Sequence, residues 1–150
     1  MPPDPAITET KEQEMPPTAS PAATSSRQVI VAEAAPAAVG PYSHAVIAGG
    51  LLFCSGQLPL DPATGALVEE GPAGQAAQCL HNLSAICVAA GTTLSRAVRV
   101  GVYLTDLSAF EEVNAAYAAV FAEDAPARTA LQVAALPRGA QVEIEAIVAL

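Results

Sequence analysis

The hydrophobic pattern of the chain changes period several times after residue 27. Residues 28–33 form a short apolar run, and residues 43–48 and 51–57 are strand-like segments on either side of Gly49-Gly50. A glycine pair supplies the positive φ angles of a two-residue turn, so these two segments are predicted to form a β-hairpin. The sequence Asp61-Pro62-Ala63-Thr64-Gly65 is then typical of a turn.

A longer helical pattern occupies the middle of the chain. Pro72 suits the first turn of a helix, and Gly91 fits the position that caps its C-terminal end. Between them, apolar residues recur at near-helical spacing: Leu80, Leu83, Cys87 and Ala90. The spacing predicts a helix of about five turns over residues 71–91.

A strand, a second helix and two more strands complete the pattern. Residues 97–105 alternate as a strand does. Ser108-Ala109-Phe110-Glu111 has the spacing of a capping box, which predicts a helix running to about Ala122. The apolar face of that helix consists of Phe110, Val113, Tyr117, Val120 and Phe121. Residues 129–134 and 141–150 are strand-like and flank Leu136-Pro137-Arg138-Gly139.

The order of these elements, ββ(β)αβαββ, predicts an α+β fold in which helices cover one face of a single sheet. Only 14% of the residues are charged, so little is available to solvate the other face, and we expect self-association. Residues 1–27 are rich in proline, serine and threonine, and are predicted to be a disordered tail. The folded domain is then residues 28–150.

Composition excludes several classes of function. Fifteen acidic residues against six basic ones give a net charge of −9, which disfavours nucleic-acid binding because it repels phosphates. The three cysteines lack metal-ligand spacing, so we expect reduced core thiols and a cytoplasmic location. His44 and His81 also lack partners at ligand spacing, and no metal site is expected. Prolines, glycines or polar residues interrupt both long uncharged stretches, 34–60 and 71–95, so no membrane span is predicted.

The candidate chemistry lies in the last two strand-like segments. Alternation directs Leu131 and Val133 toward the core, and Arg128, Ala130 and Gln132 to the opposite face. The same argument directs Glu143 and Glu145 away from the core. If the two segments pair about the turn near residue 137, Arg128 and the glutamates share one face, whereas a one-residue shift separates them.

An arginine and a glutamate on one face suit a small imino-acid or keto-acid substrate. The guanidinium binds a carboxylate through two parallel hydrogen bonds, and the glutamate can handle water and protons. The alternative is a structural ion pair or a solvated strand face, which spacing alone favours, although the pattern does not decide between the two.

Five segments, taken together in order and spacing, resemble the Rid (YjgF-type) family of enamine/imine deaminases over residues 28–150. They are Gly40-Pro41-Tyr42-Ser43, Ser55-Gly56-Gln57-Leu58-Pro59, Val113-Asn114-Ala115-Ala116-Tyr117, Pro126-Ala127-Arg128-Thr129 and Val142-Glu143-Ile144-Glu145-Ala146. The resemblance implies a chorismate-mutase-like fold with a mixed sheet, two helices on one face, and a homotrimer with ligand pockets between subunits. It also implies cofactor-independent hydrolysis of 2-imino and 2-aminoacrylate-type acids to 2-keto acids and ammonia.

Carried over by position, Arg128 would hold the substrate carboxylate and Glu143 would position or activate the attacking water. Tyr42, Ser55 and Asn114 match pocket positions of the family, although packing or backbone hydrogen bonding would also explain each of them. Ala130 stands where many members carry cysteine, but its backbone N–H is still able to contact a carboxylate. The alternative function is a non-catalytic trimer that binds small carboxylates as a sensor. Endoribonuclease activity, a label often attached to the family, is disfavoured by the charge.

Overall fold

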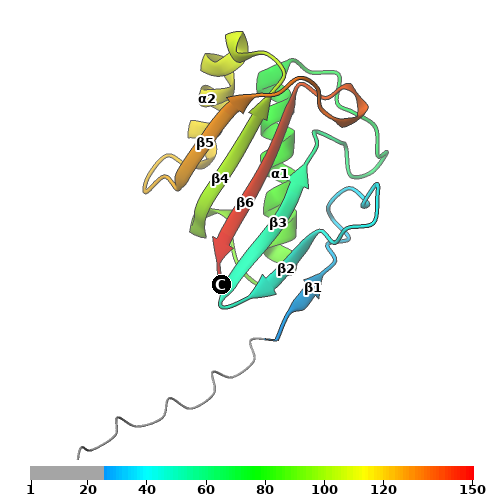
Figure 1. Cartoon of the computed structure of the whole chain (residues 1–150), viewed down its shortest axis with the longest axis vertical. Helices are drawn as coiled ribbons and strands as arrows, with labels where there is room; N and C mark the ends of the chain where they lie inside the picture. The colour runs from blue at the N-terminus through cyan, green and yellow to red at the C-terminus, as the bar shows by residue number, and fades with distance from the viewer. Residues whose placement is uncertain (1–25) are drawn as a thin grey trace, which may run out of the picture.

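Residues 26–150 are described by a computed structural model (Figure 1). The elements are β1 (Gln28–Ile30), β2 (Ala45–Ala48), β3 (Leu51–Gln57), α1 (Pro72–Ala89), β4 (Ala97–Leu104), α2 (Phe110–Val120), β5 (Ala127–Gln132) and β6 (Val142–Ala149), with single 3-10 turns at Leu94–Arg96, Leu107–Ala109 and Pro137–Gly139. The tail predicted for residues 1–27 lies almost entirely outside the described residues.

The strands form one mixed six-stranded sheet in the order β1-β2-β3-β6-β4-β5, in which only the β4–β5 pair is parallel. Both helices pack on the same face of this sheet (Figure 1). The predicted α+β architecture is therefore confirmed. The core lies between sheet and helices, and its largest fully buried side chains include Leu52, Leu80, Leu83, Ile86, Leu104 and Ile144.

The local turn chemistry follows the sequence. Gly49 and Gly50 have φ values of 58° and 78°, and they join β2 to β3 as the predicted hairpin. Pro72 is the first residue of α1, and Gly91, with φ 81°, follows its C-terminal end. The three cysteines are free and buried, as expected. Within residues 26–150, no helix is long and apolar enough to cross a membrane.

The predicted capping box is not formed. The Asp106 carboxylate instead accepts a hydrogen bond from the Ser108 N–H at 2.8 Å, which starts a 3-10 turn ahead of the helix. Ala109 then occupies the N-cap of α2 and caps it with no side chain. The helix ends at Val120, two residues before the predicted end near Ala122, because the chain leaves helical geometry at Phe121.

The pairing proposed for the last two strands is also wrong. Strand β5 pairs in parallel with β4, and β6 lies between β3 and β4. A parallel pair needs a crossover, and α2 provides it by connecting β4 to β5 across the sheet face. The C-terminal strands are thus separated by β4 and form no hairpin.

The faces of β5 are the reverse of those predicted. Arg128 and Ala130 are aligned with the buried Val100 and Val102, on the helix-covered face, and Ala130 packs against the core. Leu131 is 38% exposed on the open face. Glu143 is aligned with Tyr103, also on the open face, so Arg128 and Glu143 occupy opposite faces of the sheet within one chain.

Candidate functional site

Arg128 is held at the edge of the sheet by helix α2. Its Nη1 donates a hydrogen bond to Asn114 Oδ1 at 2.8 Å. The guanidinium carbon lies 4.7 Å from the centre of the Tyr117 ring and 5.6 Å from that of Phe110, within the range of cation–π attraction. Asn114, Tyr117 and Arg128, called the arginine cluster below, line one hollow of the surface.

Helical spacing explains how α2 holds Arg128. Asn114 and Tyr117 are three residues apart on α2, and therefore present their side chains on one face of the helix. The ring of Tyr117 is only 6% exposed, and burial raises the pKa of its hydroxyl while the Arg128 charge opposes the rise. That hydroxyl has no hydrogen-bond partner among the described residues.

Tyr42, Ser55, Gly56 and Glu143 line a second hollow and are called the glutamate cluster below. The Ser55 hydroxyl donates to the Ser43 carbonyl at 2.6 Å, and the Ser55 N–H donates to the His44 carbonyl at 2.9 Å. These bonds tie the segment that carries Tyr42 to strand β3. The Tyr42 hydroxyl accepts from the Val39 N–H at 3.2 Å, which turns its exposed ring back over the loop.

His44 supports this cluster from beneath, a role that the sequence did not reveal. Its buried ring accepts from the Ala32 N–H at Nδ1, at 2.9 Å, and donates from Nε2 to the Pro36 carbonyl at 2.8 Å. A ring that accepts at one nitrogen and donates at the other is neutral. His44 therefore fixes the course of residues 32–36 against β2. Its one trace in the sequence is a polar residue directly before an apolar strand, which does not reveal its partners.

Glu143 is half-buried on the open face of β6. Burial raises the pKa of its carboxyl group, and the like charge of Glu145 raises it further. Among residues 26–150, no hydrogen bond or ion pair reaches this carboxylate. Glu145, two residues along, is exposed and accepts a hydrogen bond from the Tyr103 hydroxyl at 2.7 Å, which raises the pKa of Tyr103.

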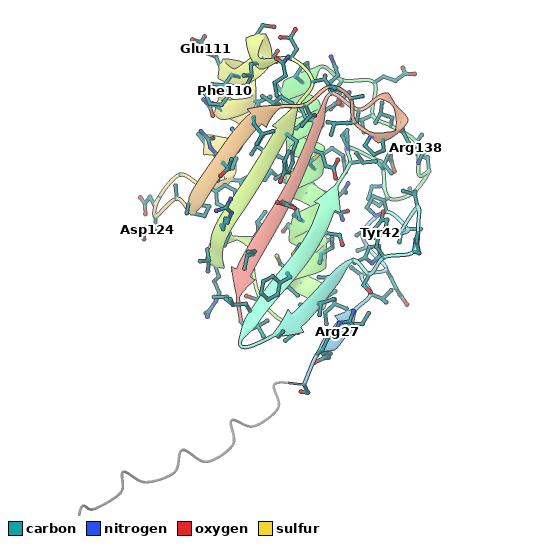
Figure 2. The ribbon with its side chains drawn as sticks, viewed as in Figure 1. Arg27, Tyr42, Phe110, Glu111, Asp124 and Arg138 are labelled. Atoms are coloured by element: carbon teal, nitrogen blue, oxygen red, sulfur yellow. The ribbon has the colours of Figure 1, made fainter. Side chains whose placement is uncertain are left out.

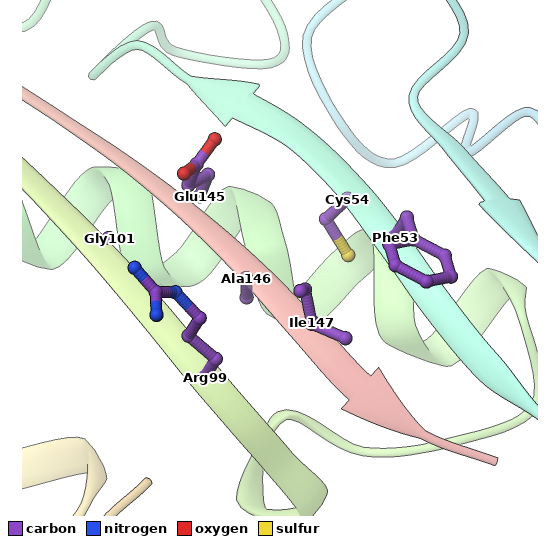
Figure 3. Close-up of a pocket in the computed structure, with 7 residues that line it drawn as sticks. All are labelled: Phe53, Cys54, Arg99, Gly101, Glu145, Ala146 and Ile147. Atoms are coloured by element: carbon purple, nitrogen blue, oxygen red, sulfur yellow. The ribbon is translucent and has the colours of Figure 1, made fainter. Parts of the chain in front are cut away.

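A third hollow lies on the open face, beside Glu145 (Figure 3). The Arg99 side chain extends over Gly101 toward Glu145 in Figure 3, and it donates a hydrogen bond to Thr129 Oγ1 at 3.1 Å. Phe53, which is 42% exposed, lines the other side. The open face is thus a mixture of apolar and charged groups.

The predicted site residues therefore fall into two separate groups. The arginine cluster lies under the edge strand β5, whereas the glutamate cluster is built on the central strands β3 and β6 and on the loop that carries Tyr42. Figure 2 shows Phe110 and Tyr42 toward opposite edges of the sheet. Ala130 lies two residues from Arg128 on β5. The Val133 N–H donates to the Leu104 carbonyl, so the alternation of a parallel ladder turns the Ala130 N–H away from β4, toward the open edge.

Metal binding has no support in the described part of the chain, where histidine, cysteine, aspartate and glutamate side chains nowhere form a group of three or more. The functional groups of the two clusters are the guanidinium of Arg128, the carboxylate of Glu143 with its raised pKa, the phenol of Tyr42, the hydroxyl of Ser55 and the amide of Asn114.

Comparison with known proteins identifies the family to which the chain belongs. The model of the family described as endoribonuclease L-PSP matches residues 32–150, and the chain belongs to this family. Its Rid (YjgF-type) resemblance is confirmed by the relatives and solved structures that follow.

The chain is 54% identical over 116 residues to RutC family protein y4sK of Sinorhizobium fredii, covering 77% of this chain and 92% of that protein. It is 48% identical over 121 residues to the 2-iminobutanoate/2-iminopropanoate deaminase of Bos taurus, covering 81% and 88%. Among solved structures, RidA from the Antarctic bacterium Psychrobacter sp. PAMC 21119 matches with a TM-score of 0.79 and 50% identity, covering 82% of this chain and 99% of RidA.

Proposed function

We propose that the protein is a cofactor-independent enamine/imine deaminase that hydrolyses 2-imino acids, of the 2-iminobutyrate and 2-aminoacrylate type, to 2-keto acids and ammonia. The name of the Bos taurus relative, 48% identical over 121 residues, supports this substrate class. The observation that carries the proposal is that the chain presents a pre-oriented arginine and a glutamate of raised pKa on opposite faces of its sheet. The arginine cluster supplies a cation for the substrate carboxylate, and the glutamate cluster supplies a proton acceptor.

Two protomers placed head to tail bring the clusters together. In such a pair the arginine cluster of one protomer would face the glutamate cluster of the next, because within one chain the two clusters line separate hollows. Such heterologous contacts close into rings when the rotation is right. A chorismate-mutase-like homotrimer with three shared pockets is the ring that the family resemblance implies, and it would also cover the open sheet face.

The chemistry asks little of the protein. Arg128 binds the substrate carboxylate through a bidentate pair of hydrogen bonds, and the outward N–H of Ala130 is free to assist. The C=N carbon is already electrophilic, so catalysis consists of orienting a water against it and moving protons.

Glu143 handles those protons. Its carboxylate accepts a proton from the water as the oxygen attacks the C=N carbon, and a carbinolamine forms. For a substrate that enters as the iminium ion, the Glu143 carboxyl group then returns this proton to the amino nitrogen of the carbinolamine. As the C–N bond breaks and ammonia leaves, the carboxylate takes the hydroxyl proton, the C=O bond forms, and the released ammonia carries that last proton away as ammonium. A carboxyl group whose pKa is raised by burial both accepts and returns a proton more readily near neutral pH. Tyr42 and Ser55 shape the wall beside it.

Two other functions are separable by experiment. A trimer that only binds small carboxylates would use the same Arg128 pocket without accelerating hydrolysis. Ribonuclease activity, which the name of the matched family model carries, is disfavoured by six basic side chains in a chain of net charge −9.

The test is imine loss in solution. The imine is generated enzymatically from an amino acid, and its disappearance is followed with the wild type, Arg128→Ala, Arg128→Lys and Glu143→Gln. We expect Arg128→Ala to lower kcat/KM by about 1,000-fold or more. Arg128→Lys should recover part of the lost kcat/KM, because the lysine keeps the positive charge but not the paired hydrogen bonds of the guanidinium. A wild type that binds pyruvate but does not outpace buffer would make the protein a sensor, and RNA cleavage in a parallel assay would favour the nuclease.

A further inference from the structure

Gly56 lies in the irregular part of β3, where the pairing with β6 shifts between Cys54 and Gln57. A Cβ atom on Gly56 would overlap Glu143 Oε1 and would lie 3.1 Å from Glu143 Cδ and 3.4 Å from Cγ. The Glu143 carboxyl group therefore rests on the bare backbone of residue 56.

Backbone conformation does not explain this glycine. Gly56 is absent from the positive-φ glycines, so an alanine fits its backbone without strain. Its lack of a side chain matters because of what lies above it. Real Cβ contacts essentially never fall below about 3.0 Å, so the methyl group of an alanine would have to displace its neighbour.

We propose that Gly56 is a positioning residue: its missing side chain creates the space in which the Glu143 carboxyl group is held against β3, within reach of the substrate pocket. The catalytic interpretation of this position rests on the proposed deaminase function. The placement itself is a statement about the glutamate cluster of a single chain, and it is testable without any substrate.

The neighbouring glutamate supplies a matched comparison. Glu145 lies over Gly101 of β4, where the crowding is milder: a Cβ on Gly101 would lie 2.9 Å from Glu145 Oε1, 3.0 Å from its Cγ and 3.2 Å from the Tyr103 hydroxyl. Glu145 is exposed, bonded to Tyr103 and outside the glutamate cluster. Crowding Gly101 therefore perturbs the same sheet face and a carboxylate of the same type, but not the one with the proposed role.

The experiment compares Gly56→Ala with Gly101→Ala in the full chain, after each variant has been shown to keep the wild-type assembly by size-exclusion chromatography with light scattering. We expect Gly56→Ala to lower kcat by about 30-fold, with KM within about threefold. This is smaller than the factor of about 100 to 10,000 that general acid–base catalysis contributes, because the displaced carboxyl group keeps some of its function. The Tm should change little, because the displaced atoms are the end of a flexible side chain. We expect Gly101→Ala to keep kcat within about twofold.

A double-mutant cycle separates positioning from general damage. In a Glu143→Gln background, the further change Gly56→Ala should cost less than about twofold, because no catalytic carboxylate remains to be displaced. An equal loss in both backgrounds, or an equal loss in Gly101→Ala, overturns the proposal.

A crystal structure of Gly56→Ala provides the readout that is independent of activity. We expect the Glu143 carboxyl group to swing away from residue 56 while the β3 backbone stays in place. A carboxyl group that keeps its position overturns the proposal. If the displacement is seen but the wild type hydrolyses no imine, the placement stands and the deaminase function fails.

Discussion

The Arg128 guanidinium is held by three neighbours, whereas the Glu143 carboxylate is held by none among the described residues. Asn114 fixes one nitrogen of Arg128, and the rings of Tyr117 and Phe110 lie against the guanidinium. Glu143 is placed by the space above Gly56 and by its half-buried position. The two charged groups of the proposed site are therefore prepared in different ways.

This difference matches two chemical tasks. A group that binds a carboxylate gains from a fixed orientation, because less conformational freedom is lost when the ligand arrives. A group that accepts and returns a proton needs an uncommitted pair of oxygens and a pKa near the working pH. In the proposed site these two tasks fall to groups on opposite faces of one sheet, so neither cluster would act alone.

Mixing protomers of two variants tests most directly whether the two clusters act together across protomers. Arg128→Ala and Glu143→Gln are each expected to keep only a small residual activity, but a protomer of one kind still carries the cluster that the other lacks. Unfolding and refolding them together in equal amounts should restore about a quarter of the wild-type sites, since each interface draws its two protomers at random. The assay is imine loss before and after mixing.

The control for mixing is each variant refolded alone. If the mixture is no more active than the separate variants, both clusters act within one chain. We expect the opposite result, because Arg128 and Glu143 lie on opposite faces of the sheet.

The hydrogen bonds within the two clusters should differ in importance. Asn114→Ala removes the partner that orients Arg128, and we expect KM to rise about tenfold with kcat within about threefold, as for loss of a hydrogen bond to a charged group. Ser55→Ala removes a neutral bond to the Ser43 carbonyl and should raise KM by about threefold or less. Equal effects in steady-state kinetics would contradict the idea that only the arginine cluster depends on fixed orientation.

The pH profile tests the glutamate cluster. Protonation of Glu143 should produce an acid limb in kcat/KM with a midpoint above the usual range for a carboxyl group, because burial and Glu145 both raise its pKa. Glu145→Gln removes the like charge but keeps an acceptor for Tyr103, so the midpoint should move to lower pH while staying above the usual range, because burial is the larger cause of the raised pKa of Glu143. An acid limb that moves upward, or that survives in Glu143→Gln, assigns it to another group.

Much of the fold could be predicted because its signals are local. The glycine pair of the β2–β3 hairpin, Pro72 and Gly91 at the ends of α1, and the order of strands and helices all follow from a few neighbouring residues. Which residues of β5 face the core could not be predicted from such local signals. On this edge strand the small Ala130 packs inward while the larger Leu131 faces out, so the rule that large apolar residues point to the core gave the reverse assignment.

The candidate site illustrates the same limit. Its residues could be named from motifs, but their distribution over two faces depends on the long-range parallel pairing of β4 with β5. His44 and Gly56 could not be recognised in advance, because one acts through loop carbonyl and amide groups that come near only in the fold, and the other through a side chain that is missing.

The smallest expected effect concerns the ring beneath Arg128. Tyr117→Phe keeps the aromatic face but removes a buried hydroxyl that has no partner among the described residues, so we expect the free energy of unfolding to rise by up to about 1 kcal/mol, with kcat and KM unchanged. Tyr117→Leu loses the ring, the cation–π attraction of about 0.5–2 kcal/mol and some core packing, and should raise KM. Denaturant unfolding and steady-state kinetics check both. A Phe variant that is less stable only as the assembled oligomer would mean that the Tyr117 hydroxyl finds its partner across the interface, which would extend the arginine cluster into the neighbouring protomer.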